Sequence, residues 1–297
     1  MRLRHLVRPG PFIWRLIRFA IYKLPSRLKN YIIGIFNSAL KRQKCNICKS
    51  KEVKFVYATW AYRFFWCSKC NIYFVGNPPE PEKIRQEYLV DNEEDYRYER
   101  SRHFMLDENN RICWKDWKGW KEQTFSELNL TDFEKKLGGL RRTLEIGCAE
   151  GKVLEILKSR GWIVVGLEMG RYMAKLCRES ALPVILGRAE EIVFKEQSFD
   201  LVVMFHTLEH TLNPLVVLSN IFTILKKSGR LIFEVPYFVN KKPLLEDFNN
   251  IAHLYFFTEK GINKMLSIIG FRQLNKFIYE DQLDKPKRNI CYLVEKR

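Results

Sequence analysis

The chain has 297 residues, of which 46% are hydrophobic and 14% aromatic. It can therefore bury a sizeable core, which excludes a chain that is disordered throughout. Its length suits one large domain with a small appendage, or two modest domains. The net charge of +17 is concentrated at one end: residues 1–44 hold eleven of the 51 basic residues and no acidic one, so the rest of the chain is close to balanced.

The first predicted element is a basic amphipathic helix within residues 1–44. Its apolar stretch at 12–24 is interrupted by Arg15 and Arg18 and ends at Pro25, so it is too short and too charged to span a bilayer or to act as a signal peptide. Such a segment either contacts an anionic membrane surface or packs on the chain's own catalytic domain, and helical periodicity does not separate the two. We expect a cytoplasmic protein, peripheral at the inner membrane face if the first alternative holds.

Residues 45–81 form the next predicted unit, a small zinc-ribbon-like module. Short β-rich runs at 53–57, 62–66 and 72–75 alternate with two C-x-x-C pairs that are 18 residues apart, and the proline-rich stretch 77–81 marks the boundary. Each pair places two thiolates on one side of a turn, and two pairs complete a tetrahedron around Zn²⁺ with no open position. The predicted ligands of this structural zinc are Cys45, Cys48, Cys67 and Cys70.

The remaining residues, 82–297, are expected to form the largest domain. Residues 82–137 read mostly as a helical cover, and from residue 143 onward short apolar strands alternate with helices. Predicted strands lie at 143–146, 163–167, 184–186, 199–205, 230–235 and 291–294, with another near Phe277; predicted helices lie at 152–160, 171–180, 214–225 and 258–269. This alternation is typical of an α/β fold with a doubly wound, mostly parallel sheet over residues 138–297.

A glycine-bearing turn follows the first of these strands. Gly147 and Gly151 allow the backbone to turn tightly and to approach a ligand where a Cβ would collide, and the next helix starts with free N–H groups. The spacing differs from the G-x-G-x-x-G fingerprint of dinucleotide-binding folds. The loop therefore indicates a cofactor other than a dinucleotide.

Residues 144–151 resemble the first motif of class I (Rossmann-like) S-adenosylmethionine methyltransferases, and the resemblance extends over residues 82–297. It implies that Glu168, at the end of the second strand, holds both ribose hydroxyls of S-adenosylmethionine. Ala149 stands where the family frequently has glycine, and Arg188 where it often has an acid beside the adenine. The cofactor contacts that the resemblance implies are Glu145, Gly147, Cys148, Ala149, Gly151, Glu168, Met169, Ala189, Glu190 and Phe205.

The cysteine pairs, together with the residues up to Pro81, resemble an N-terminal module that some bacterial members of this family carry. Those members often modify sugars or other products of polysaccharide and natural-product clusters. The resemblance thus implies an acceptor of this class, with zinc in a structural role.

A second cluster of polar residues is expected on the acceptor side. His206, Glu209 and His210 follow a predicted strand, and His253 lies after a later one, so two loops at the same sheet edge bring imidazoles together. Histidine suits removal of a proton from a hydroxyl near neutral pH. We expect His253 to be the general base, with Tyr255 as its partner or substitute.

Two other interpretations of this cluster stay open. Ubiquinone-pathway O-methyltransferases and small-RNA 2′-O-methyltransferases resemble this stretch, with an E-x-x-E-H motif that binds a divalent ion where this chain has His206, Glu209 and His210. In the third interpretation, Glu209 and His210 only cap and orient their loop.

The sequence predicts a methyltransferase that acts on a hydroxyl of a sugar, a lipid-linked glycan or another small metabolite. The first alternative is an RNA methyltransferase whose zinc module and basic tail bind rRNA or tRNA, with aromatic side chains such as Trp60 and Trp66 stacking on bases. The second is a non-catalytic zinc-bearing scaffold, against which the glycine turn and Glu168 argue.

Overall fold

The computed structural model describes residues 44–58, 62–81, 104–106, 112–114, 117–238, 253–281 and 287–297. The predicted basic helix within residues 1–44 and most of residues 82–116 lie outside the described residues. Among the helices of the described residues, none is both long and apolar enough to cross a membrane.

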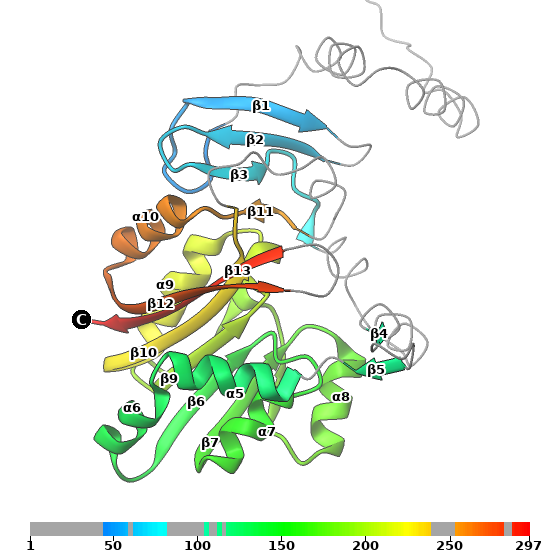
Figure 1. The fold of residues 1–297 in the computed structure, drawn as a ribbon. Coiled ribbons are helices and arrows are strands. Elements are labelled where there is room, and N and C mark those ends of the chain that lie inside the picture. Colours follow the sequence, from blue (N-terminus) through cyan, green and yellow to red (C-terminus); the bar gives the residue numbers. More distant parts are fainter. Residues whose placement is uncertain are drawn as a thin grey trace, which may run out of the picture.

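A seven-stranded sheet forms the centre of the molecule, in the order β12-β13-β10-β9-β6-β7-β8 (Figure 1). Strands β10, β9, β6, β7 and β8 run parallel, β13 pairs antiparallel with β10, and β12 pairs antiparallel with β13 at the edge of the sheet. The chain order reverses between β6 and β9, which is the switch point of a doubly wound sheet. The predicted α/β fold class is therefore confirmed. The strands are β6 (Arg141–Ile146), β7 (Trp162–Glu168), β8 (Val184–Leu186), β9 (Phe199–Phe205), β10 (Leu225–Pro236), β12 (Phe271–Asp281) and β13 (Lys287–Lys296).

Helices cover both faces of this sheet. On one face, α5 (Trp117–Glu127), α6 (Leu130–Leu137) and α7 (Lys152–Ser159) bury their apolar side chains in one core cluster, which also takes in Cys177 of α8 (Arg171–Glu179). On the other face, α9 (Pro214–Ile224) and α10 (Glu259–Ile269) contribute to a second, larger cluster. The two clusters together bury the sheet, as the continuous apolar sequence of its central strands requires.

The ends of α9 and α10 follow from local sequence. The side chain of Asn213 accepts a hydrogen bond from Val216 N at 3.3 Å and Pro214 occupies the first turn, which is where proline is tolerated. Thr258 caps α10 by accepting from Gly261 N at 3.2 Å, and Gly270 ends it in the left-handed conformation with φ of 101°. Both helix starts agree with the sequence prediction.

The cysteine pairs belong to a smaller sheet, in the order β1-β2-β3-β11. Strands β1 (Val53–Ala58), β2 (Arg63–Cys67) and β3 (Ile72–Val75) follow one another in the chain, whereas β11 (Tyr255–Phe256) comes from the C-terminal half. Figure 1 shows β11 beside β3, on the side of the small sheet that faces the large one. Side chains of the small sheet lie in the same core cluster as α9 and α10.

Part of the expected helical cover has a different structure. Strands β4 (Phe104–Leu106) and β5 (Ile112–Trp114) pair antiparallel within the range 82–137, which was predicted to be mostly helical. The sequence between them, Asp-Glu-Asn-Asn-Arg, is rich in turn-forming residues and joins two short apolar runs. These hairpin signals were outweighed in the prediction by the helical pattern on either side.

Candidate functional site

The turn after β6 has the conformation that its glycines predict. Gly147, Ala149 and Gly151 all have positive φ, at 71°, 46° and 84°. A Cβ on Gly147 would lie 2.3 Å from Thr207 Oγ1, and one on Gly151 would lie 2.5 Å from Leu182 Cδ1. Both glycines are therefore required by backbone conformation and by close packing, and Ala149 adopts a conformation that glycine would reach without strain.

The carboxylate of Glu168, at the end of β7, reaches this turn. It accepts hydrogen bonds from the backbone nitrogens of Ala149, Met169 and Gly170, each at 2.8 Å. Burial raises the pKa of Glu168 even though these three N–H groups oppose the rise. The glycine turn and Glu168, both predicted to contact S-adenosylmethionine, thus lie in direct contact with each other.

Two further predicted cofactor residues lie beneath the turn. Glu145 is buried, burial raises its pKa well above the ordinary value, and its Oε2 has no hydrogen-bond partner among the described residues. Such an orphaned buried oxygen is unusual without a bound group. The side chain of Cys148 is buried too, with its Sγ packed under Gly166 of β7, so that only its backbone belongs to the turn.

The residues predicted beside the adenine lie in the short 3₁₀ helix η1 (Ala189–Glu191). Glu190 Oε1 accepts from Leu212 N at 2.6 Å, and the Glu190 carboxylate pairs with Arg188 at 3.5 Å. Its backbone carbonyl accepts from the amide of Asn220 at 3.0 Å. Glu190 therefore fastens η1 to the loop before α9, a role that the sequence did not suggest.

A charged network occupies the carboxyl ends of β9 and β10. The imidazole of His206, which directly follows β9, lies with Nε2 2.7 Å from Glu234 Oε1 and Nδ1 3.5 Å from Glu209 Oε1. Burial alone would lower the pKa of His206, but the two carboxylates raise it to about 9. His206 is thus an imidazolium at neutral pH, held in a left-handed conformation with φ of 47°.

Lys121 and Tyr279 complete this network. Both donate to Glu234 Oε1 at 2.8 Å, and Lys121 Nζ also lies 4.1 Å from the ring of Phe205. Burial would raise the pKa of Glu234, but Lys121 and His206 lower it to about 2. The fully buried carboxylate of Glu234 thus has three polar partners, which are Lys121, His206 and Tyr279.

Sequence reasoning missed Lys121, Glu234 and Tyr279. A signal for Lys121 was present: it is spaced by four and seven residues from Phe125 and Leu128, which are buried on the apolar face of α5 and beyond its end. A lysine on such a face needs a buried acid as partner. Which acid that is depends on the tertiary fold.

Glu209, His210 and His253 come together beside the charged network. Each offers one ligand atom, and these atoms lie within 4.8 Å of one another. The rings of His210 and His253 are 4.9 Å apart between centroids. Glu209 lies in the short 3₁₀ helix η2 (Leu208–His210), and its side chain is buried. His253 is therefore brought to the other predicted residues from a distant part of the chain.

The environment of Glu209 fits a cation. Among the described residues neither carboxylate oxygen has a hydrogen-bond partner, although both are buried. Burial would raise the pKa of Glu209, but the neighbouring histidines lower it, so the group is an anion. A buried carboxylate beside two imidazoles is a donor set that suits Zn²⁺ or another divalent transition-metal ion.

Tyr255, two residues beyond His253, is placed differently. Its hydroxyl donates to Leu212 O at 3.0 Å and accepts from the side chain of Asn46 at 3.3 Å. Burial raises the pKa of Tyr255 to about 12. The hydroxyl is thus committed to structural hydrogen bonds, and it does not substitute for His253 as a base.

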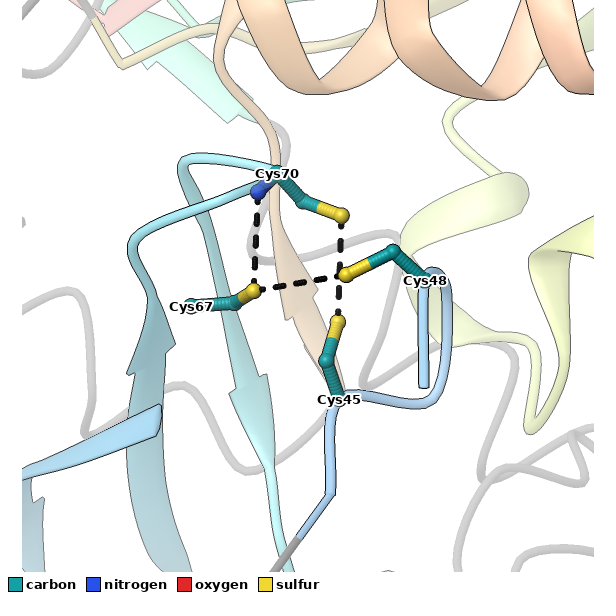
Figure 2. Close-up of side chains that lie close together, drawn as sticks. All are labelled: Cys45, Cys48, Cys67 and Cys70. Carbon is teal, nitrogen blue, oxygen red and sulfur yellow. Dashed lines mark hydrogen bonds between the residues drawn. The ribbon is translucent and has the colours of Figure 1, made fainter. Parts of the chain in front are cut away.

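The four module cysteines point toward a common centre (Figure 2). The Sγ atoms of Cys45 and Cys70 are 3.9 Å apart, those of Cys48 and Cys67 are 3.6 Å apart, and all four lie within 4.8 Å of one another. A tetrahedral zinc with bonds of about 2.3 Å requires sulfurs roughly 3.8 Å apart. Burial raises the pKa of Cys67 to about 11, so this thiol would ionise at neutral pH only beside a cation. The cluster fits zinc in size and in charge.

Comparison with known proteins assigns a domain to the sheet. Residues 144–233 match the family model described as a methyltransferase domain. An uncharacterized protein of Methanocaldococcus jannaschii is 26% identical over 155 residues, which cover 48% of this chain and 73% of that protein. The ubiquinone biosynthesis O-methyltransferase of Saccharophagus degradans is 28% identical over 158 residues, which cover 50% of this chain and 62% of the enzyme.

Among solved structures, the cyclase SpnF is similar in fold. It has a TM-score of 0.58 and 14% sequence identity, with 74% of this chain and 97% of SpnF covered. The match with the ubiquinone enzyme spans less than two thirds of that enzyme's length. The fold similarity covers a larger share of the chain than residues 144–233 of the family model.

Proposed function

We propose that this chain, an S-adenosylmethionine-dependent methyltransferase, transfers the methyl group to a hydroxyl oxygen of a small acceptor. The acceptor class that we propose is a sugar, a lipid-linked glycan or another small metabolite. A relative named as an O-methyltransferase of ubiquinone biosynthesis supports oxygen as the methylated atom. The zinc module supports the sugar or glycan class through its resemblance to modules of sugar-modifying members.

One observation carries this proposal: the glycine turn and the Glu209, His210 and His253 cluster lie at the carboxyl ends of neighbouring parallel strands. Strand β6 leads into the turn, and its neighbour β9 leads into His206 and the cluster. Methyl transfer needs the nucleophile in line with the methyl–sulfur bond, and two sites at one switch point provide that alignment.

In the proposed mechanism His253 removes the proton of the acceptor hydroxyl. Its ring is partly exposed and lies beside the anionic Glu209, which stabilises the imidazolium that forms. His206 is already paired with Glu209 and Glu234, so its role is to hold the Glu209 loop in place rather than to accept a proton.

A divalent cation is the second candidate for activating the hydroxyl. The buried carboxylate of Glu209 favours it, because Oε1 lies 3.5 Å from His206 Nδ1 and 3.9 Å from His210 Nε2, and neither oxygen accepts a hydrogen bond from the described residues. Glu209, His210 and His253 would hold the ion, and a bound cation polarises a hydroxyl and lowers its pKa. His206 replaces the first glutamate of the related E-x-x-E-H motif and is bound to Glu234. It therefore stays outside the proposed ligand set.

Two further proposals concern the rest of the chain. Cys45, Cys48, Cys67 and Cys70 hold one structural zinc, and residues 1–44, of which 1–43 lie outside the described residues, contact an anionic membrane surface. Flotation with anionic liposomes, using the full chain and a variant that lacks residues 1–44, tests the second. Equal flotation of both would remove the membrane proposal.

The experiment that tests the function uses S-adenosylmethionine with a tritiated methyl group. The purified chain is incubated with cell extract separated into lipid, polysaccharide, small-molecule and RNA pools. Label that appears in one of the first three pools, in the form of a methyl ether, supports the proposal. Label in the RNA pool would favour the alternative of an RNA methyltransferase, and absence of S-adenosylmethionine binding in calorimetry would favour a scaffold.

A further inference from the structure

Leu254 forms hydrogen bonds both to the zinc module and to the acceptor side of the site. Its backbone nitrogen donates to Glu209 O at 2.8 Å, and its backbone oxygen accepts from Val75 N at 2.9 Å. Val75 ends β3, the strand that follows the second cysteine pair. The peptide groups of Leu254 therefore lie between the zinc-bearing strand and the loop of the candidate catalytic cluster.

Strand β11 continues this connection along its own length. Tyr255 pairs with Phe74, and Phe256 pairs with Tyr73, so both residues of β11 belong to the small sheet. The ring of Phe256 packs 5.7 Å from that of Phe64 in β2 and 6.0 Å from that of His253. The residue before this short strand is Leu254, and the one before that is His253.

Both cysteine turns also contact this segment directly. Asn46, between Cys45 and Cys48, donates to the hydroxyl of Tyr255, which in turn donates to Leu212 O in the loop after the cluster. At the second turn, Thr258 Oγ1 donates to Asn71 O at 2.7 Å. All of these groups are buried or partly buried, so their hydrogen bonds are expensive to lose.

We propose that the four-cysteine module is a positioning device for the acceptor side: with its cysteines held by metal, it fixes β11 and thereby sets His253 against Glu209 and His210. Asn46 and Tyr255 are the positioning residues of this device. The inference rests on the proposed function of His253. It adds that the module acts on the catalytic cluster rather than only on its own fold.

The geometry supports this assignment over an independent module. A two-residue strand has little stability of its own, so β11 depends on its pairing with β3. Glu209 lies on the other side of Leu254, in a 3₁₀ helix of three residues. Strand β11 and helix η2 are both short, and the two peptide groups of Leu254 join them. They should therefore move together when either loses its hydrogen-bond partner.

The test measures amide hydrogen exchange in the full zinc-loaded chain, in peptides spanning 207–213 and 253–258. Asn46→Ala breaks the link at the cysteine turn, and Tyr255→Phe removes the bridging hydroxyl. The matched control is Tyr292→Phe, which removes a buried hydroxyl bonded to Asn263 Oδ1 at 3.2 Å, on the other side of α10 from the cluster. Zinc content and S-adenosylmethionine affinity are measured for each variant.

We expect exchange in both peptides to rise about fivefold to tenfold in Asn46→Ala and in Tyr255→Phe, and to stay unchanged in Tyr292→Phe. The imidazole NMR signals of His210 and His253 should shift only in the first two variants, with zinc content and cofactor affinity retained. Unchanged exchange at 207–213 in both variants would overturn the inference. Failure of the wild-type chain to bind S-adenosylmethionine would instead remove the proposed function and leave this comparison intact.

Discussion

The carboxylate of Glu168 accepts a hydrogen bond from the backbone nitrogen of Ala149 at 2.8 Å, so the end of one strand holds the turn that follows its neighbour. Glu168→Gln should raise the dissociation constant for S-adenosylmethionine at least tenfold, because an amide accepts more weakly than a carboxylate from the ribose hydroxyls and from the turn. Calorimetry measures this change. Glu155→Gln, on the exposed face of α7, is the control, and equal affinities of the two variants would contradict the role of Glu168.

Ala149 and Ala181 both adopt the left-handed backbone conformation, at φ of 46° and 54°. Replacement by glycine removes roughly 1–2 kcal/mol of strain from the folded chain. It also costs roughly 0.5–1 kcal/mol of stability, because the unfolded chain becomes more flexible. Ala149→Gly and Ala181→Gly should therefore each raise the free energy of unfolding by about 0.5–1 kcal/mol in urea titrations. Ala181 lies after α8 and is not itself part of the turn, so the larger change in cofactor affinity should come from Ala149→Gly. A loss of stability in both would show that the strain is not real.

The acid stability of the chain should depend on Glu234. Its pKa is about 2 in the folded chain, below its ordinary value of 4.5, so the native state binds fewer protons than the unfolded state between these values. Its contribution, roughly 3 kcal/mol, is complete above pH 4.5 and disappears as the pH falls toward 2. Glu234→Gln should lower stability at pH 7 by about 3–5 kcal/mol, since it leaves Lys121 without its charge partner, and should flatten the loss between pH 4.5 and 2.

Urea unfolding at several pH values checks the slope, with Glu179→Gln as the matched control. Glu179 pairs with Lys175 at 3.6 Å, and both side chains are more than half exposed, so solvent weakens this pair. The control should cost about 1 kcal/mol or less. Parallel pH curves for wild type and Glu234→Gln would contradict the assigned pKa of Glu234.

The sequence was informative wherever a local pattern decides the structure. Alternating strands and helices predicted the large sheet, and the rule that ligands bind at the carboxyl ends of parallel strands brought His253 to His210 before any coordinates. The double C-x-x-C spacing likewise predicted four cysteines around one centre. In these cases the residues that form a feature either lie close in the chain or share one edge of a regular sheet.

The rest depended on contacts between distant segments. Strand β11 has only two residues, and its pairing with β3 joins positions about 180 apart, so no periodic signal marks it. The partner of Lys121 could not be predicted from the sequence either, because Glu234 lies 113 positions away and resembles an ordinary acid at the end of a strand. Both features join segments that are far apart in the chain, and only the packed fold specifies them.

His253→Ala should separate acceptor activation from cofactor binding. The ring lies 4.9 Å from that of His210 and near the buried Glu209, and His253 is not among the residues that form the glycine turn. We therefore expect methyl transfer to the labelled acceptor pool to fall at least about 100-fold, the usual effect of losing a general base, with S-adenosylmethionine affinity changed less than about twofold.

Glu209→Gln and chelator treatment distinguish the two candidate roles of the ring. If His253 acts as base, activity survives a chelator too weak to strip the four-cysteine site and follows a single ionisation near neutral pH. If the cluster holds a cation, the same chelator abolishes activity, Glu209→Gln abolishes it as well, and added metal restores only the wild-type chain. Full turnover in His253→Ala would exclude both roles, because each needs that imidazole in contact with either the acceptor or the ion.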